Sequence, residues 1–542
     1  MAELVYIFDG IALSPDAPEE NAIGEISRKM SRAGIPIRDC RLDICKKSVD
    51  ARKKSDIKLV YSVRVAFDGG EGEKYRQKFE RIGARAMAID SLELNFGKAD
   101  MGARPLVVGM GPAGMFCALL LAENGYRPII IDRGDSVTDR VESLSRFYSE
   151  HKLDTESNIQ FGAGGAGTFS DGKLLTRIND PKCSYVLETF KKFGAPDEVT
   201  VKAKPHIGTD VLRVVVDNIL SRIEELGGEV IYRCRLDGID ENSDGTVTAH
   251  TTKGDFNCGA LVLALGHSAR DTYAMLIKGG FAIVPKPISV GVRIEHRRAD
   301  IEEALYGDMA GHAALGAAEY ALSDTKGERG VYTFCMCPGG EVVAAASEED
   351  SVVVNGMSCF ARDGVNSNSA VAVSVRVEDF CEVEGNLALG AIEFQRKIER
   401  SAFAAGGGGY AVPVQTVGDF MSGVTGTEPS RVMPTYMNGE NFKVASVDDV
   451  LPEFVCRSLR YGLLSFDKKI RGFAAPDALL SAAETRTSAP VRILRGEDMS
   501  ALGKERIYPC GEGAGYAGGI TSAAVDGIKV AISLMSKYRP ID

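Results

Sequence analysis

The chain has 542 residues, 44% of them hydrophobic, and a formal net charge of −11 at pH 7. That length exceeds what one hydrophobic core usually organises, so we expect about two or three domains. The acidic charge argues against a general nucleic-acid binder, and no apolar run approaches the roughly 18 residues of a membrane span. The N-terminus lacks the basic segment and cleavage site of a signal peptide, and the 12 cysteines show no C-x-x-C spacing, so we expect a cytoplasmic protein with reduced thiols.

The first 98 residues predict a small separate domain. A strand at 4–8 precedes a helix at 20–33, an extended basic segment at 38–67 and a charged helix at 71–82. This order is typical of a small α+β layer, and a ferredoxin-like arrangement is one candidate. Its basic residues suggest an anionic ligand or partner, although a solvated hairpin explains them more simply; they are Lys46, Lys47, Arg52, Lys53 and Lys54.

A dinucleotide-binding unit is predicted at residues 105–134. An apolar strand at 106–108 runs into Gly109, Gly111 and Gly114 at G-x-G-x-x-G spacing, and a helix, a second strand and Asp132 follow. In this pattern the first glycine permits a tight turn, the second lets the backbone approach a pyrophosphate, and the third lets helix and strand pack closely. The helix N-terminus offers free N–H groups to phosphates. Asp132 stands where an acid can hydrogen-bond ribose hydroxyls.

A second glycine-rich stretch, at 156–174, carries four glycines within six residues. Such density suits backbone that passes close to a flat or crowded group, so we expect a loop that faces the cofactor, with a flexible surface loop as the alternative. An amphipathic helix at 209–226 and strands at 229–234, 245–252 and 260–265 follow, and the last strand runs into Gly266 and His267.

Residues 286–497 lack any nucleotide motif, and we expect them to form an inserted substrate or cap domain of mixed α+β structure. The chain then returns at 506–531 with another strand, glycine turn and helix. We therefore expect one α/β, Rossmann-type domain made of residues 101–285 and 498–542, beside the small domain at 1–98.

Three separated motifs now match one pattern: the G-x-G-x-x-G turn with Asp132, the A-L-G-H sequence at 264–267, and C-G-E-G-A-G at 510–515. Together they resemble the glutathione-reductase-type FAD-binding fold. The chain is similar to bacterial FAD-dependent dehydrogenases of unassigned substrate, which carry a small domain ahead of the FAD domain. The segments with counterparts in those proteins are 164–174, 204–210, 336–340 and 484–490.

The resemblance implies that FAD is the cofactor. It places the pyrophosphate at the first glycine turn and the adenosine ribose at Asp132. Glu512 takes the place where many such flavoproteins have an aspartate beside the ribityl chain, and the helix that starts near Ile520 points at the flavin ring. The residues expected to bind FAD are Gly109, Gly111, Pro112, Ala113, Gly114, Asp132, Arg133, Gly164, Gly165, Gly167, Thr168, Gly266, Gly511, Glu512, Gly519, Ile520 and Thr521.

The function that the resemblance implies is an FAD-dependent oxidoreductase, a dehydrogenase or reductase that transfers hydride or electrons between flavin and an unidentified small-molecule substrate. One alternative is a flavin-dependent monooxygenase. Another is a flavin-binding protein that acts on or with RNA through its N-terminal domain. Because only one dinucleotide fingerprint is present, NAD(P)H would be a transient electron donor.

The catalytic residues are left open, with four candidates: His206, His267, Cys337 and Arg486. Cys335 and Cys337 are too closely spaced for a C-x-x-C redox centre, and buried structural cysteines are common. Arg486 and Arg492, with Glu484, either anchor an acidic substrate or pair with each other at a domain junction. No metal site is expected.

Overall fold

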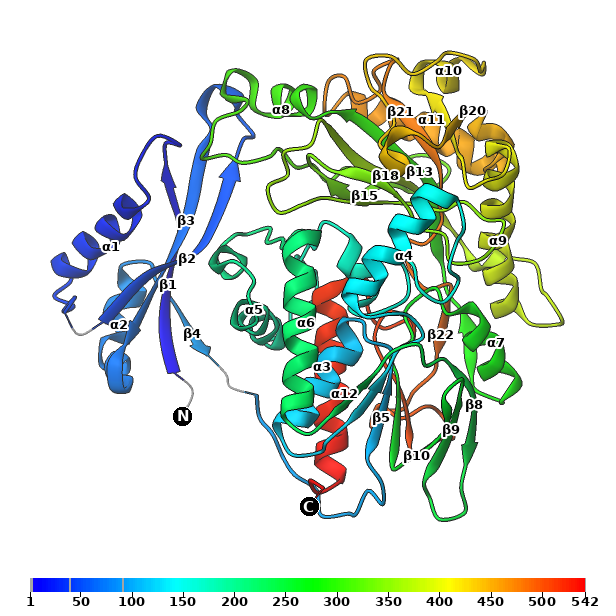
Figure 1. The fold of residues 1–542 in the computed structure, drawn as a ribbon. Helices are drawn as coiled ribbons and strands as arrows, with labels where there is room; N and C mark the ends of the chain where they lie inside the picture. The colour runs from blue at the N-terminus through cyan, green and yellow to red at the C-terminus, as the bar shows by residue number, and fades with distance from the viewer. Residues whose placement is uncertain (1–2, 39, 90–91, 542) are drawn as a thin grey trace.

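The structure is a computed structural model that describes residues 3–38, 40–89 and 92–541. It is a mixed α/β protein built around sheets of four, five and seven strands (Figure 1). The N-terminal elements form the four-stranded sheet at one side of the molecule. The five-stranded sheet and its helices lie below the seven-stranded sheet in the view of Figure 1.

The four-stranded sheet has the order β2-β3-β1-β4, and every neighbouring pair is antiparallel. The element order β1-α1-β2-β3-α2-β4 is that of ferredoxin-like layers. The strands are β1 (Glu3–Leu13), β2 (Cys40–Asp50), β3 (Lys58–Phe67) and β4 (Arg85–Ile89), and the helices are α1 (Glu20–Arg32) and α2 (Arg76–Arg81). The charged helix expected at 71–82 is shorter, because its glycine-rich start is a 3-10 segment, Asp68–Tyr75, rather than α-helix.

The five-stranded sheet is entirely parallel and has the order β23-β11-β5-β6-β7. Its three central strands are buried on both faces, as expected of parallel strands covered on either side. The strands are β5 (Pro105–Val108), β6 (Ile129–Ile131), β7 (Glu229–Ile231), β11 (Ala260–Leu263) and β23 (Ile507–Pro509).

Helices cover one face of this sheet and a small meander covers the other. Val107 packs with the helices, whereas Leu106 and Val108 pack with the meander, as the period of two in a strand requires. The helices are α3 (Pro112–Glu123), α5 (Lys182–Lys192), α6 (Thr209–Glu225) and α12 (Ile520–Lys537). The meander strands are β8 (Leu236–Glu241), β9 (Val247–Thr251) and β10 (Gly254–Cys258), and α7 (Arg270–Lys278) lies beside them.

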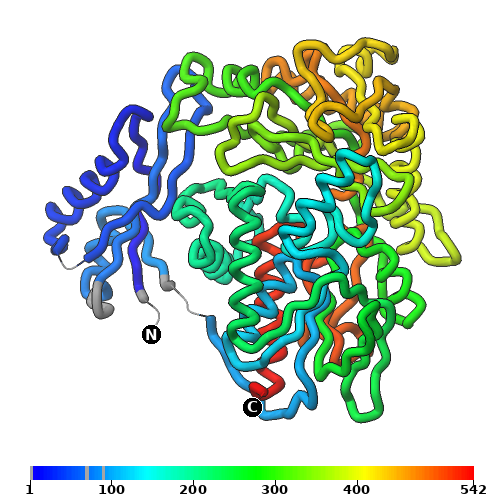
Figure 2. The backbone as a smooth tube through the Cα atoms, in the orientation of Figure 1, coloured from blue at the N-terminus to red at the C-terminus, as the bar shows by residue number. Residues whose placement is uncertain are grey.

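The end of the chain completes this sheet. Leu261 of β11 pairs with Ile507 of β23, and the C-terminal helix α12 lies against α3 (Figure 2). Two segments almost 400 residues apart, 112–123 and 507–537, are therefore neighbours in one layer.

The seven-stranded sheet has the order β14-β15-β18-β13-β21-β19-β20 and is antiparallel except for its last pair. Its strands are β13 (Ile288–Arg297), β14 (Ser323–Asp324), β15 (Val331–Cys337), β18 (Asn366–Val375), β19 (Val412–Thr416), β20 (Phe442–Val444) and β21 (Leu479–Glu484). The helices around it are α8 (Arg298–Tyr306), α9 (Leu387–Gly406), α10 (Val417–Ser422) and α11 (Glu453–Asp467).

Two short sheets and one helix remain. Strand β12 (Ile283–Pro285) comes just before β13, and strand β22 (Val491–Ile493) comes just after β21. The two pair with each other, so the chain enters and leaves the large sheet at the same place. The other pair is β16 (Glu341–Ala344) and β17 (Val354–Met357), and the helix is α4 (Val137–Glu150). In the described part of the chain, every helix is too short or too polar to cross a membrane.

The N-terminal sheet is tied to the rest of the chain by backbone hydrogen bonds. The amide of Lys47 donates to the carbonyl of Val201 at 2.8 Å, and the amide of Ala203 donates back to Lys47 at 2.9 Å. Its core also continues into the core of the seven-stranded sheet. The boundary expected near residue 98 is thus crossed by both polar and apolar contacts.

Candidate functional site

A pocket of about 290 Å³ opens at the carboxyl ends of β5 and β11. Ligands of open α/β sheets bind at this end of the parallel strands. The wall combines the turn after β5, the loop at 160–175, the segment at 264–272 and the turn before α12. Residues 334, 335, 355 and 486–487, from the seven-stranded sheet and its surroundings, close it from the other side.

The turn after β5 is built from glycines with different tasks. Gly109 has a φ of +104°, and a Cβ there would lie 2.2 Å from the carbonyl oxygen of Ala264. A Cβ at Gly114 would lie 1.9 Å from the carbonyl oxygen of Gly109. At Gly111, by contrast, the nearest atom to an added Cβ is 4.0 Å away. Two of these glycines therefore fix the turn itself, and Gly111 leaves open space on the pocket side.

Two helices point their N-termini into this pocket. The pocket wall includes Pro112 and Ala113 from the first turn of α3 and Ile520 from the first turn of α12. The two helices approach closely because Gly527 of α12 has no side chain, and a Cβ there would lie 2.1 Å from the carbonyl oxygen of Ala113. Both N-termini carry unpaired N–H groups and a positive dipole end, an arrangement that attracts anionic groups.

Asp132 follows β6 and lines the pocket, but its carboxylate is already engaged. One oxygen accepts from the amide of Met110 at 2.8 Å, and the other accepts from the amides of Gly134 and Gly162, both at 2.9 Å. The side chain therefore ties the first glycine turn to the second glycine-rich stretch. Any ribose hydroxyl would share this carboxylate with three backbone donors.

Arg133 lies beside Asp132 at the same wall. Its guanidinium lies 4.3 Å from the centre of the Phe161 ring and forms ion pairs with Glu156 at 2.9 Å and Asp271 at 2.8 Å. These partners raise the pKa of Arg133, although burial alone would lower it. The side chain is consequently a fixed, charged platform rather than a mobile one.

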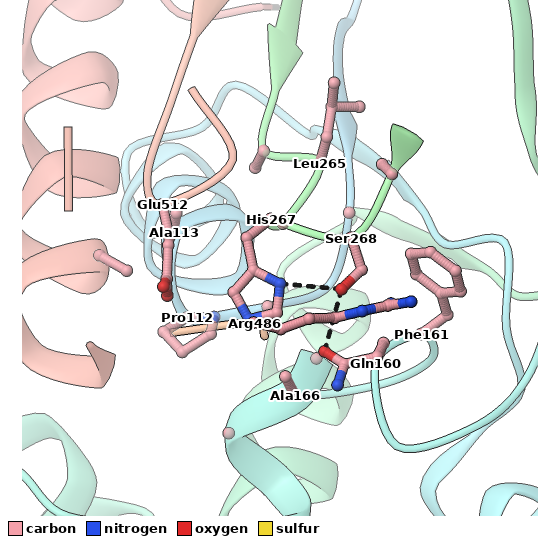
Figure 3. Close-up of a pocket in the computed structure, with 18 of the residues that line it drawn as sticks. Pro112, Ala113, Gln160, Phe161, Ala166, Leu265, His267, Ser268, Arg486 and Glu512 are labelled. Atoms are coloured by element: carbon pink, nitrogen blue, oxygen red, sulfur yellow. Dashed lines mark hydrogen bonds between the residues drawn. The ribbon is translucent and has the colours of Figure 1, made fainter. Parts of the chain in front are cut away.

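His267, Ser268 and Gln160 form a hydrogen-bonded chain along the wall (Figure 3). Gln160 donates its amide to the carbonyl of Ala345, so its oxygen is the acceptor for the Ser268 hydroxyl at 3.2 Å. Since that hydroxyl has one proton, Nδ1 of His267, 2.8 Å from the Ser268 oxygen, must be the donor. Nε2 is then the acceptor nitrogen of the ring, with no hydrogen-bond partner among the described residues.

Burial lowers the pKa of His267 to about 3, and the nearby charges of Arg486 and Arg270 act in the same direction. The ring is thus neutral at pH 7. It can accept a hydrogen bond from a ligand but cannot supply a proton as an imidazolium at that pH.

Arg486 lines the pocket, and its guanidinium is anchored from behind. It pairs with Glu399 at 3.1 Å, and Glu399 also binds Arg270 at 2.7 Å and the Thr485 hydroxyl at 2.6 Å. The two arginines hold the pKa of Glu399 well below its usual range despite burial. Arg270 also pairs with Glu348 at 2.8 Å, so the two arginines are matched by two carboxylates and the Arg486 guanidinium is held rigidly at the wall.

The pairing considered for Arg486, Arg492 and Glu484 does not occur. Glu484 binds Arg293 at 2.9 Å, and Arg492 donates to the carbonyl of Gly515 at 3.2 Å. The sequence suggested these partners because they are near neighbours in the chain. The true partner of Arg486 comes from α9, which packs against β21.

Glu512 lies in the turn that precedes α12 and is half-buried at the pocket wall. No described residue donates a hydrogen bond to its carboxylate. Burial raises the pKa of Glu512 to about 7, and only Lys286 opposes this shift. The side chain is therefore an acceptor whose donors must come from a ligand or water.

The structure brings most of the expected FAD-binding residues to one pocket. Those on its wall are Gly109, Gly111, Pro112, Ala113, Asp132, Arg133, Gly165, Gly167, Gly266, Glu512, Gly519 and Ile520. The others lie just behind it and support its backbone: Gly114, Gly164, Thr168, Gly511 and Thr521. For example, the Thr521 hydroxyl donates to the carbonyl of Leu174 at 2.6 Å, and the amide of Gly511 donates to Asp526 at 2.7 Å.

The structure places the four catalytic candidates at different positions. His267 and Arg486 line the pocket, and Cys337 is fully buried next to Cys335, which does line it. His206 lies elsewhere, at a second cavity of about 340 Å³ between the N-terminal sheet and residues 305–319. Its Nε2 lies 3.2 Å from the carbonyl of Phe360, and burial lowers its pKa to about 4.

Several wall residues carried no signal in the sequence. The role of Ser268 is visible only through its hydrogen bond to Gln160, which lies 108 positions earlier in the chain. Leu236 reaches the wall as the first residue of β8, a strand that the sequence pattern did not predict, and Arg235 directly precedes it. Inside the glycine-rich stretch at 156–174, where a cofactor-facing loop was expected, the further wall residues are Gln160, Phe161, Ala166, Ser170 and Lys173.

The basic residues of the N-terminal domain lie on and just after β2, and two are paired at the surface. Lys47 binds Glu19 at 3.1 Å and Arg52 binds Asp50 at 2.8 Å. Nothing in this hairpin favours the RNA alternative over a solvated surface. No group of three or more potential metal ligands occurs among the residues that the structure describes.

Two parts of the chain match known protein families. Residues 287–487 match the family described as FAD-dependent protein, C-terminal domain-like, and residues 10–66 match a domain of unknown function. A relative from Clostridium beijerinckii, named as an uncharacterized protein, is 47% identical over 505 residues, which cover 92% of this chain and 93% of that protein.

Solved structures provide only distant likenesses. FqzB shares 10% identity with a TM-score of 0.34, covering 81% of this chain and 77% of its own. CtdE in complex with FAD also shares 10% identity, with a TM-score of 0.32, covering 80% of this chain and 84% of its own. Scores this low carry no argument about the reaction.

Proposed function

We propose that this protein, which belongs to the family of the Clostridium beijerinckii relative, is an FAD-dependent oxidoreductase. The observation that carries the proposal is the meeting of two helix N-termini and two glycine turns in one pocket. The match of residues 287–487 to a domain of FAD-dependent proteins supports the same cofactor.

The pocket suits a long anionic dinucleotide. Added Cβ atoms at Gly518 and Gly519 would have no neighbour within 4 Å, and at Gly111 the nearest atom is 4.0 Å away, so glycine leaves a cradle along the wall. In this proposal the N-terminus of α3 holds the pyrophosphate, and Glu512 accepts hydrogen bonds from ribityl hydroxyls. The N-terminus of α12 faces the flavin ring and stabilises negative charge there.

Bound FAD would supply the two-electron chemistry, and the protein would position the substrate. We infer a dehydrogenase or reductase that acts on a small molecule. Neutral His267 would accept a hydrogen bond from the substrate through Nε2, and the guanidinium of Arg486 at the pocket wall would donate to an anionic or carbonyl group of the substrate. NAD(P)H is one candidate electron donor, and it would bind transiently, since the chain has a single dinucleotide fingerprint.

The first experiment identifies the cofactor. Protein purified or reconstituted with flavin is denatured, and the released flavin is separated by chromatography. FAD is expected, because the glycine turn and Asp132 belong to the adenosine half of the site. Release of FMN, or no flavin after reconstitution, would refute the proposal.

The second experiment separates the reaction classes. Flavin reduction is followed by stopped flow with candidate donors, first without oxygen and then with oxygen and small-molecule substrates. A reductase or dehydrogenase exchanges electrons with its substrate under anaerobic conditions. Oxygen consumption that depends on both donor and substrate would instead identify a monooxygenase.

A further inference from the structure

Strand β15 brings two cysteines to the pocket. Cys335 lines the pocket and is half-buried, whereas Cys337, two residues later, has no exposed surface. The sulfur of Cys337 lies 3.3 Å from the carbonyl oxygen of Cys335 and is within hydrogen-bonding reach of the Cys335 sulfur. One thiol thus faces a ligand cavity and a second thiol adjoins it in the interior.

A β-bulge presents the first of these thiols. Between the pairs Phe334–Ala370 and Cys337–Asn368, β15 carries one residue more than its partner β18. Within this bulge Cys335 has a φ of +44°, a left-handed conformation that residues other than glycine seldom adopt. Bulges of this kind redirect side chains beside functional sites, and here the redirected side chain is a thiol.

Two cations hold the bulge in place. Arg293, which is fully buried, donates to the carbonyl of Cys335 at 3.0 Å and is itself paired with Glu484 at 2.9 Å. Lys173, from the glycine-rich stretch, donates to the carbonyl of Met336. Each cation is held in turn by a carboxylate, Arg293 by Glu484 and Lys173 by Asp171, so the two thiols lie in a rigid setting built from three separate segments.

This setting favours a thiolate at the cavity. The neighbouring Cys337 thiol lowers the pKa of Cys335 below its usual range, the charges of Arg293 and Lys173 add to the effect, and burial and Asp171 oppose it. The same contact and burial raise the pKa of Cys337. A reactive thiolate with a protonated thiol beside it is the pattern of an attacking and a resolving cysteine.

We propose that Cys335 and Cys337 form a reversible dithiol–disulfide pair at the pocket wall, with Cys335 as the attacking thiolate. With a small disulfide as oxidant, the Cys335 sulfur displaces one thiolate and forms a mixed disulfide. Cys337 then attacks the Cys335 sulfur, loses its proton, and releases the second half as a thiol. Two electrons pass from the cysteines to the small disulfide, whose bond breaks as the new bond forms.

The test uses the full chain in glutathione buffers of increasing oxidised fraction, followed by acid quenching, alkylation and peptide mass spectrometry. The expected product is an internal disulfide that joins Cys335 and Cys337 and is reversed by excess reduced glutathione. The exposed Cys381 provides the reference thiol in the same sample. The proposal is refuted if Cys335 stays reduced, or carries only glutathione, in buffers that glutathionylate Cys381.

Variants separate the two roles. Cys337→Ser removes the resolving thiol, so Cys335 is expected to accumulate as a mixed disulfide with glutathione. Cys335→Ser abolishes the internal disulfide, and Cys381→Ser is the matched control that leaves it unchanged. Formation of the disulfide in the unmodified protein decides the question even if a variant fails to fold.

The rate of alkylation by iodoacetamide provides a second readout. The charged and titratable groups around Cys335 are Cys337, Arg293, Lys173 and Asp171, with Glu484 paired to Arg293 and Arg362 to Asp171, and together they lower the pKa of Cys335. At pH 6.5, Cys335 is therefore expected to react several-fold faster than the exposed Cys381, because a larger fraction of it is thiolate. Slower reaction than Cys381 at this pH would contradict the assigned thiolate.

Neither disulfide formation nor the alkylation rate requires a bound cofactor. The dithiol proposal and the proposed function can therefore be refuted separately. Flavin content is recorded on the same samples from their absorbance. An internal disulfide in protein that binds no flavin would refute the oxidoreductase and leave the thiol pair standing. Bound FAD without the disulfide would refute the thiol pair and leave the oxidoreductase proposal standing.

Discussion

Two carboxylates line the same pocket in different states. Asp132, at the end of β6, accepts hydrogen bonds from three backbone amides, whereas Glu512, before α12, accepts none from the described residues. The first is bound into the fold, and the second is left available. One end of the pocket thus has a carboxylate that the protein backbone already binds, and the other end has a carboxylate whose donors would come from a ligand.

The difference follows from the local backbone. Near Asp132, the glycine turn, the turn at residue 134 and the glycine-rich loop converge, and each presents an N–H group that needs an acceptor. Around Glu512 two nearby donors face other acceptors, because the amide of Gly511 binds Asp526 and the Tyr273 hydroxyl is shared between the carbonyls of Gly266 and Gly513, and Lys286 acts on the carboxylate only through its charge. An acid in a nucleotide motif can therefore be a structural tie as much as a ligand contact.

The largest expected effect comes from Asp132→Ala. Three backbone N–H groups lose their acceptor, and each buried orphan costs about 1–3 kcal/mol. We expect the free energy of unfolding, measured by chemical denaturation of flavin-free protein, to fall by about 3 kcal/mol or more. Glu512→Ala in the same assay should not lower it, since no protein hydrogen bond is lost and the acid that is removed has a pKa raised by burial. Equal stability losses would erase the distinction between the two acids.

Gly111→Val tests the first turn without disturbing it. The backbone of Gly111 has an ordinary φ of −73°, and an added Cβ meets nothing closer than 4.0 Å, so the variant should fold. The branched side chain would occupy the approach of the pyrophosphate, and FAD affinity is expected to fall by about a hundredfold or more, roughly 2.7 kcal/mol. Gly114→Val is the contrasting variant, which should lose the fold itself. Full flavin binding by Gly111→Val would mean that the phosphates lie elsewhere.

The sequence predicted those parts of the site that depend on local geometry. Turn glycines, the strands before them and the helices after them recur at fixed spacing, so Gly109 and Gly111 could be placed from spacing, whereas Ile520 was placed by the resemblance to FAD-binding folds. Asp132 could be placed as well, but not its three backbone donors, because one of them comes from residue 162.

Residues whose role depends on remote partners could not be found in this way. Arg486 was considered with Glu484 and Arg492, yet it pairs with Glu399 from a different helix. Cys335 reaches the pocket only because β15 contains a bulge against β18. Such pairings are fixed by the packing of whole elements, and no spacing along the chain records them.

Glu512→Ala tests whether the Glu512 carboxylate binds FAD. Loss of a charge-assisted hydrogen bond to a ribityl hydroxyl should weaken FAD binding by about tenfold, near 1.4 kcal/mol. The dissociation constant is measured by flavin titration of apoprotein. Glu505→Ala, at an exposed position in the preceding loop, is the matched control and should bind FAD normally. If Glu512→Ala also binds FAD like the parent, the C-terminal half of the site is wrongly assigned.

The last effect expected is a pH dependence that belongs to Glu512 and not to Asp132. Burial raises its pKa to about 7 in the folded protein, against about 4.3 for an unfolded chain. Between these values the folded state keeps a proton that the unfolded state has released. The contribution of Glu512 to the free energy of unfolding must then fall as pH rises from about 4.3 to 7, and level off above 7.

Glu512→Gln removes this titration while keeping the shape of the side chain. In flavin-free protein, the thermal midpoint of the variant relative to the parent should be lowest near pH 5 and rise steadily until about pH 7. In the parent, FAD affinity should increase over the same interval, because the carboxylate accepts ribityl hydrogen bonds better than the acid, and the variant should lack this increase. A constant difference in midpoint from pH 5 to 8 would show that Glu512 is ionised throughout, and the contrast with Asp132 would then rest on hydrogen bonding alone.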